Sequence, residues 1–124
     1  MQLATSRYAN GDLIRASGLA AVGVTVGEPR FALEYELAGN VRMLAPFGLL
    51  GIDDETEFTR RYRAQLERHG IEKILRVLAA IARREHREGV VLLCFEPAGE
   101  FCHRRVLAEW LEERTGVVVP ELRR

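Results

Sequence analysis

The chain has 124 residues, of which 48% are hydrophobic and 29% are charged, and its formal net charge at pH 7 is +0. This length and this balance are typical of a globular protein and exclude a disordered chain. We therefore expect residues 1–124 to form one domain. Because the charges cancel, no overall field attracts nucleic acid or an anionic membrane surface.

The sequence shows no sign of export or of membrane insertion. Its first seven residues lack the basic start and apolar core of a signal peptide. No apolar run approaches the roughly 20 residues that a membrane-spanning helix needs. We therefore expect a cytoplasmic protein with no membrane partner. Cys94 and Cys102 could form a disulfide, but a reducing cytosol favours free thiols or a bound metal.

The first part of the chain predicts two strands separated by a short helix. Residues 3–6 predict a short strand, and residues 12–16 supply about one turn of helix. From Ala20 to Val26, valines alternate with smaller or polar residues, which is typical of a strand. Pro29 cannot donate to a strand ladder, so this strand ends before it.

Residues 31–52 are the least regular part of the chain. They contain four glycines or prolines, and a link of this length within a compact domain is usually functional. We expect the segment from Gly39 to Gly51 to fold over the strand ends as a lid, with Pro46 near the cysteines.

Two helices follow this irregular segment. Asp53 and Asp54 offer an N-cap, and Phe58, Tyr62 and Leu66 recur at every fourth position before Gly70. A second apolar stripe predicts a helix over residues 71 to about 87.

The central stretch runs from Val90 to Trp110 and predicts a strand, a tight loop and a helix. Residues 90–93 form a β-branched apolar run, residues 97–99 break it, and helical spacing begins at Phe101. We expect Val106, Leu107 and Trp110 to pack this helix on the sheet. Residues 117–119, three consecutive valines, predict a short final strand.

Strands that alternate with helices predict an α/β fold: a small three-layer, mainly parallel sheet with helices on both faces, Rossmann-like in class. In open α/β sheets, ligands bind beyond the carboxyl ends of the strands. This rule brings together a set of candidate ligand-binding residues from distant segments: Thr5, Ser6, Asn10, Pro29, Arg30, Pro46 and Arg104.

The same edge holds four candidate catalytic residues: Cys94, Glu96, Cys102 and His103. Cys94 and Glu96 share one face of the strand end, and the other two lie in the first turn of the last helix. Free N–H groups there favour an anion or a thiolate, so Cys102 is a candidate nucleophile with His103 or Glu96 as its acid–base partner. With Arg104 and Arg30, the same N–H groups could hold a phosphate or carboxylate.

Two other interpretations stay open for these residues. All four side chains can bind zinc, but the spacing lacks the usual ligand pairs, so we assign no metal ligand. In a purely structural interpretation, the cysteines are core residues and His103 is packed. Arg104 is then a surface charge paired with Glu100 or Glu109.

Residues 60–87 suggest a separate class of function. They contain nine basic and three acidic residues, and Lys73, Arg76, Arg83, Arg84 and Arg87 lie away from the apolar stripe, where they could bind a nucleic-acid backbone. No aromatic residues interleave with them for base stacking, which favours a solvated helix face instead.

Several motifs, taken in order, resemble the domain of unknown function 488 family, and in particular its short single-domain prokaryotic members. They are Thr5-Ser6…Asn10, Gly27-Glu-Pro-Arg30, Leu44-Ala-Pro46, Leu92-Leu-Cys-Phe-Glu96 and Phe101-Cys-His-Arg104…Glu109-Trp110. The resemblance implies a small α/β domain whose cysteines suggest an enzymatic role, without supplying a reaction.

We therefore expect the site to bind an anionic small molecule or nucleotide, as a thiol-dependent enzyme. The alternative is a non-catalytic module that binds nucleic acid or a structural metal. The sequence leaves the cofactor and the oligomeric state open.

Overall fold

The computed structural model describes all residues from 1 to 124. Four parallel strands form one sheet in the order β1-β4-β2-β3, which confirms the predicted fold class. The strands are β1 (Gln2–Arg7), β2 (Ala20–Gly23), β3 (Leu37–Asn40) and β4 (Gly89–Cys94). The helices are α1 (Gly11–Ser17), α2 (Glu55–His69), α3 (Ile71–Arg84) and α4 (His103–Thr115), with a 3-10 turn η1 (Arg42–Leu44).

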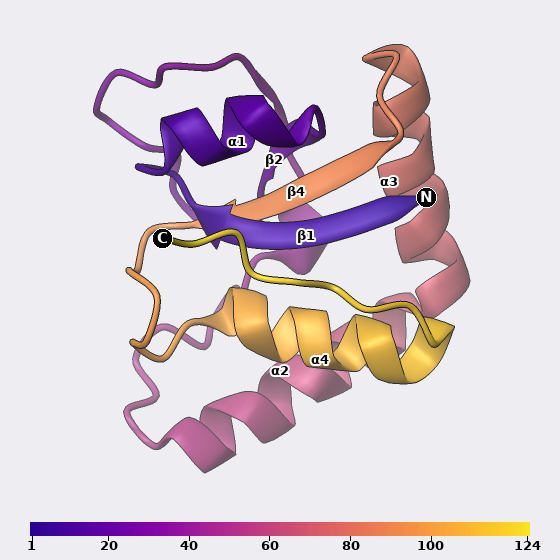
Figure 1. Ribbon diagram of the computed structural model, residues 1–124. Helices are drawn as coiled ribbons and strands as arrows, with labels where there is room; N and C mark the ends of the chain where they lie inside the picture. The colour runs from indigo at the N-terminus through magenta and orange to yellow at the C-terminus, as the bar shows by residue number, and fades with distance from the viewer.

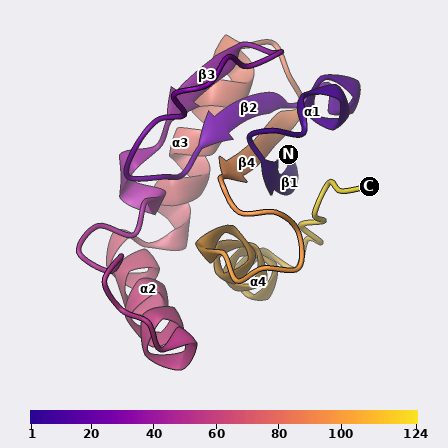
Figure 2. The ribbon, with the colours of Figure 1, turned by 90° about the vertical axis from the view of Figure 1, so that its left-hand side faces the viewer.

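The helices form layers on both faces of the sheet (Figure 1). On one face, Ile14 of α1 packs against a small cluster that includes Ala21 and Val91. On the other face, α3 and α4 cover a larger core that includes Val90, Leu92 and Trp110. Helix α2 lies against α3 and α4 and farther from the sheet (Figure 2). None of the helices is both long and apolar enough to cross a membrane.

Strand β4 is the centre of the sheet. All six of its residues are buried, and it pairs with β1 on one side and with β2 on the other. This burial on both faces is why its sequence is a continuous apolar run. The carboxyl ends of β1, β4 and β2 therefore lie side by side, and the loop after β4 leads directly to the start of α4 (Figure 2).

The predicted helices are confirmed, with changes of boundary at the end of α3 and at the start of α4. Asp54 caps α2, because its carboxylate accepts hydrogen bonds from the backbone N–H groups of Thr56 and Glu57 at 2.8 and 3.1 Å. Helix α3 ends at Arg84 and not near residue 87. The chain turns there because His86 adopts a φ of 56°, and the Arg87 N–H donates back to the Ala82 carbonyl at 2.8 Å.

Three strand predictions need correction. Strand β2 ends at Gly23 rather than at Val26. Strand β3 falls inside the segment that the sequence predicts as loop; it lies at the sheet edge with its residues only half-buried, so it carries no alternating apolar pattern. Residues 117–119 form no strand: Val117 and Val118 are exposed, and the tail instead makes a single bridge between Glu121 and Thr5.

The segment expected to act as a lid lies at the carboxyl ends of the strands, as predicted, although its first residues belong to β3 and η1. Leu44 and Ala45 are fully buried, and the Tyr62 hydroxyl donates a hydrogen bond to the Leu44 carbonyl at 2.5 Å. These contacts anchor the start of the segment. Opening and closing of the lid stays a prediction.

Candidate thiol site at the carboxyl ends of the strands

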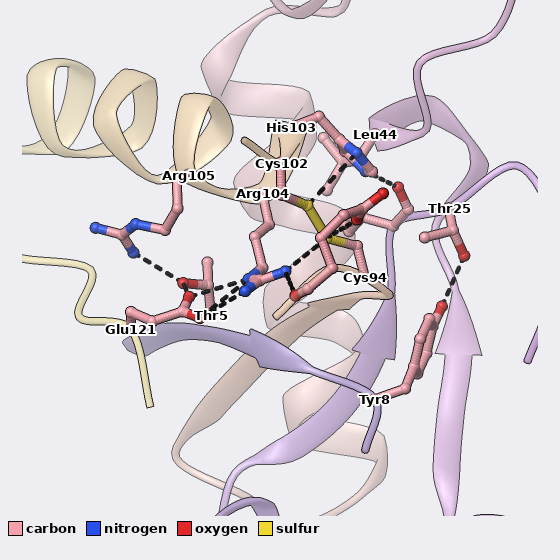
Figure 3. Close-up of a disulfide and its surroundings, with 12 residues drawn as sticks. Thr5, Tyr8, Thr25, Leu44, Cys94, Cys102, His103, Arg104, Arg105 and Glu121 are labelled. Carbon is pink, nitrogen blue, oxygen red and sulfur yellow. Dashed lines mark hydrogen bonds and ion pairs between the residues drawn. A yellow bond between two sulfur atoms is a disulfide. The ribbon is translucent and has the colours of Figure 1, made fainter. Parts of the chain in front are cut away.

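Cys94 and Cys102 are joined by a disulfide (Figure 3). The expectation of free thiols or a bound metal is therefore wrong for this structure, which has no free cysteine. Cys94 is the last residue of β4, and Cys102 is the N-cap of α4, one residue earlier than predicted. The turn at Gly99, where φ is 93°, returns the chain so that the helix starts beside the strand end.

His103 is oriented by the backbone of the neighbouring strand end. Its Nε2 lies 2.6 Å from the Val24 carbonyl, so Nε2 carries the hydrogen and donates it. The other ring nitrogen, Nδ1, is then unprotonated, and it lies 4.0 Å from Cys102 Sγ. Burial lowers the pKa of His103 by removing water from the charged form, which keeps the ring neutral near pH 7. His103 can thus accept a proton.

Arg104 is a buried charge, 1% exposed, and not the surface residue that pairing with Glu100 or Glu109 would require. Its Nη1 lies 2.9 Å from Cys94 Sγ and donates to the Glu96 carbonyl at 2.7 Å. Arg104 therefore does not face Cys102, the candidate nucleophile. Its guanidinium faces the other sulfur, on Cys94.

Glu121, from the C-terminal tail, compensates the charge of Arg104. The guanidinium donates to both carboxylate oxygens, with the shortest contact 2.7 Å from Nη2 to Oε2. Thr5 donates to the same carboxylate at 2.5 Å, and Arg105 donates to Thr5 at 2.8 Å. Burial opposes ionisation of Glu121, but the bonds from Arg104 and Thr5 outweigh it and hold the pKa of this carboxyl below its usual value. Sequence reasoning missed Glu121.

The tail also occupies two further predicted ligand-binding residues, Ser6 in β1 and Asn10 at the N-cap of α1. Ser6 donates to the Leu122 carbonyl at 2.7 Å, and the Asn10 amide donates to Ser6 at 3.1 Å. Thr5, Ser6 and Asn10 are therefore at the predicted edge, but their hydrogen bonds go to the C-terminal segment.

A cavity of about 120 Å³ opens beside the disulfide. Glu96 and His103 line it, and Pro46 joins them from the predicted lid, so these three residues meet as predicted. Its lining residues are Thr25, Val26, Gly27, Pro46, Leu50, Phe95, Glu96 and His103. Pro29 and Arg30 do not line it, and no hydrogen bond or ion pair connects the exposed Arg30 to the site.

Arg7 is a residue that the sequence reasoning overlooked. It ends β1 and is the register partner of Cys94 in the parallel ladder, so the two side chains share one face of the sheet. Its buried Nε has no hydrogen-bond partner, and its guanidinium forms no ion pair. Its position at the end of the first predicted strand is a signal that could have found it. Arg7 thus brings a guanidinium without a carboxylate partner to this edge of the sheet.

The fold and the site define a small parallel α/β domain with a cysteine–histidine cluster at the strand ends. Residues 37–115 match the family model DUF488-N3a, described as the active DUF488-N3 subclade, and this range is more than half of the chain. The chain therefore belongs to the domain of unknown function 488 family, as the sequence motifs suggested. The matched range contains the disulfide, His103 and Arg104, and it ends before Glu121. No curated protein and no solved structure matches the chain.

Proposed function

We propose that this domain is an enzyme that depends on reduced Cys94 and Cys102 and acts on an anionic small molecule or nucleotide at the carboxyl ends of the strands. One observation carries the proposal: both sulfurs, the unprotonated nitrogen of His103 and the Glu96 carboxylate converge beside one cavity. Reactive groups of several types rarely converge in a purely structural contact. The matching family model, described as an active subclade, adds support.

The chemistry begins with the reduced form of the pair. With Nε2 donating to Val24, Nδ1 of His103 is the acceptor nearest to Cys102 Sγ and can take the thiol proton. The start of α4 assists, because the first-turn N–H groups and the positive end of the helix dipole stabilise a thiolate at the N-cap. A thiolate made in this way is the nucleophile.

The anionic part of the substrate needs a cation that is not already paired. Arg104 does not supply it, because Glu121 holds its guanidinium. Arg7 is the candidate that we choose: it lies in register with Cys94, and its buried Nε has no hydrogen-bond partner, although the residue does not line the cavity. We therefore assign the anion to Arg7 and to the start of α4.

A binding experiment tests this assignment. Inorganic pyrophosphate and adenosine monophosphate are titrated into the reduced protein, and binding is followed by amide chemical shifts. We expect shifts at residues 94–104 that saturate, and about a tenfold loss of affinity in Arg7→Gln, since one charge-assisted contact contributes roughly 1.5 kcal/mol. Arg76→Gln, an exposed arginine on α3, is the matched control. Equal binding by both variants would remove Arg7 from the site.

A metal site in the reduced protein is the second candidate. The donor atoms of Cys94, Cys102 and His103 all lie within 4.8 Å of one another, which is compact enough for one ion. Both sulfurs are bonded to each other in the disulfide, so this function requires reduction first. Metal analysis of protein purified under reducing conditions, with and without a chelator, separates the two functions.

The nucleic-acid alternative rests on the exposed basic residues of α3, including Lys73, Arg76 and Arg83. Arg84 is less available, because it pairs with Glu85 and donates to the Ala38 carbonyl. Phosphate contacts release counterions, so this function predicts an affinity for duplex DNA that falls steeply as salt rises.

A further inference from the structure

The two sulfurs of the disulfide lie in unequal surroundings. Cys102 is at the N-cap of α4, 4% exposed and next to His103. Cys94 is fully buried at the end of β4. A sulfur must be reached before it can be attacked, and Cys102 is the less buried of the two residues.

Arg104 makes the second difference between the sulfurs. Its Nη1 lies 2.9 Å from Cys94 Sγ, within reach of a charge-assisted hydrogen bond to a thiolate. Glu121 and the Glu96 carbonyl hold the guanidinium in this position, so it needs no rearrangement when charge develops on the sulfur (Figure 3). The Glu96 carboxylate lies 3.3 Å from the same sulfur and opposes a negative charge there, but the contact with Arg104 is the shorter one. The sulfur beside a fixed cation is the better leaving group in disulfide exchange.

We propose that the Cys94–Cys102 disulfide exchanges with small thiols and disulfides, that Cys102 is the sulfur attacked, and that Cys94 leaves as a thiolate stabilised by Arg104. This inference rests on the proposed function, for which it names the reaction. In the first step a thiolate RS⁻ bonds to Cys102 Sγ, the bond between the two cysteines breaks, and its electron pair stays on Cys94 Sγ.

A second small thiol completes the reaction. It attacks the sulfur of the R group, releases the disulfide RSSR and returns Cys102 as a thiolate, to which His103 lies adjacent. Overall, two RSH molecules are oxidised to RSSR while the protein disulfide is reduced to two thiols, and the reverse reaction reoxidises the pair. The Arg7 guanidinium, whose buried Nε has no hydrogen-bond partner, favours an R group that carries carboxylates, as glutathione does.

Peptide mapping of the full-length protein tests the site of attack. The oxidised protein is treated with glutathione, quenched with acid, alkylated and digested. We expect glutathione on Cys102 and an alkylated thiol at Cys94. In Cys94→Ser treated with glutathione disulfide, the mixed disulfide between glutathione and Cys102 should accumulate. Cys102→Ser should react with glutathione disulfide at least about tenfold more slowly, because its remaining thiol is buried.

Arg104→Gln tests the leaving group, with Arg76→Gln, an exposed arginine of α3, as its control. We expect opening of the disulfide to slow by about tenfold in Arg104→Gln and to stay unchanged in the control. If Arg104→Gln does not fold, the mapping on the unaltered protein decides. Glutathione found on Cys94, or a disulfide that glutathione opens only after the protein is denatured, overturns the proposal.

Uncharged 2-mercaptoethanol separates this inference from the anionic-ligand proposal. If it opens the disulfide at Cys102 as fast as glutathione does, the exchange reaction stands and the assignment of an anion to Arg7 fails. If glutathione is faster and Arg7→Gln removes the difference between the two rates, the exchange reaction and the assignment of the anion to Arg7 both stand.

Discussion

Arg104 donates hydrogen bonds to both carboxylate oxygens of Glu121, which ties the C-terminal tail to the first turn of α4. The Arg104 side chain is 1% exposed and that of Glu121 is 11% exposed, so water screens this ion pair poorly. Glu121 therefore holds the Arg104 side chain in place while Arg104 contacts Cys94.

We predict that Glu121→Gln lowers the free energy of unfolding by about 1–3 kcal/mol, because it leaves a buried guanidinium without its counter-charge. Denaturation in urea measures the change. Glu109→Gln, an exposed residue of α4, is the control and should change stability by less than about 0.5 kcal/mol. Equal effects in the two variants would show that the Arg104 pair does not stabilise the fold.

The Glu121 carboxylate also makes the stability of the fold depend on pH. Its pKa in the folded protein is below the value of 4.5 that it has when free. A carboxyl of this kind stabilises the fold above its unfolded pKa, and the contribution is lost as the pH falls through the lower, folded pKa. We expect the stability difference between the unaltered protein and Glu121→Gln to be largest near pH 7 and to shrink below about pH 4.5. Urea denaturation at pH 7 and at pH 3 measures it, and a difference that grows in acid would contradict it.

The sequence predicts the parts of the fold whose signals are local. Strand β4 is buried on both faces, and so its residues form one apolar run. Helix α2 has its cap at Asp54 and its buried residues, Phe58, Tyr62 and Leu66, at every fourth position. The position of the site follows from these elements, because parallel strands end at one edge of the sheet.

The parts that the sequence does not predict depend on contacts between distant residues. Strand β3 is held by backbone pairing with β2, and its half-buried residues leave no apolar pattern. Thr5 and Glu121 are 116 positions apart, so their hydrogen bond is invisible until the fold is known. The disulfide is a related case, since spacing along the chain does not tell which way two cysteine side chains point.

Trp110 provides a test of the core. It is 1% exposed, belongs to the larger core cluster, and donates from its ring nitrogen to Glu67 at 2.5 Å, which joins α4 to α2. The predicted packing of Trp110, Leu107 and Val106 is confirmed. We predict that Trp110→Ala lowers the free energy of unfolding by about 3–5 kcal/mol through the lost contacts and the cavity that remains. Val118→Ala, at a residue that is 72% exposed, should have almost no effect in the same urea denaturation.

The last prediction concerns the reactivity of the two cysteines. Because they form a disulfide, neither should react with iodoacetamide until a reductant is added. After reduction we expect Cys102 to react first, since it is the less buried of the two and lies beside Nδ1 of His103. Cys94 should react slowly despite its contact with Arg104, because it is fully buried.

A time course followed by peptide mapping measures both rates, and its additives separate the remaining alternatives. Phosphate bound at the start of α4 should slow Cys102 alone, whereas a metal shared by both cysteines would protect both until a chelator is added. Pre-incubation with the chelator should therefore leave the rates unchanged if the thiol enzyme is the correct function. If both cysteines stay inert after reduction under every condition, they are core residues, and neither the thiol enzyme nor the exchange reaction survives.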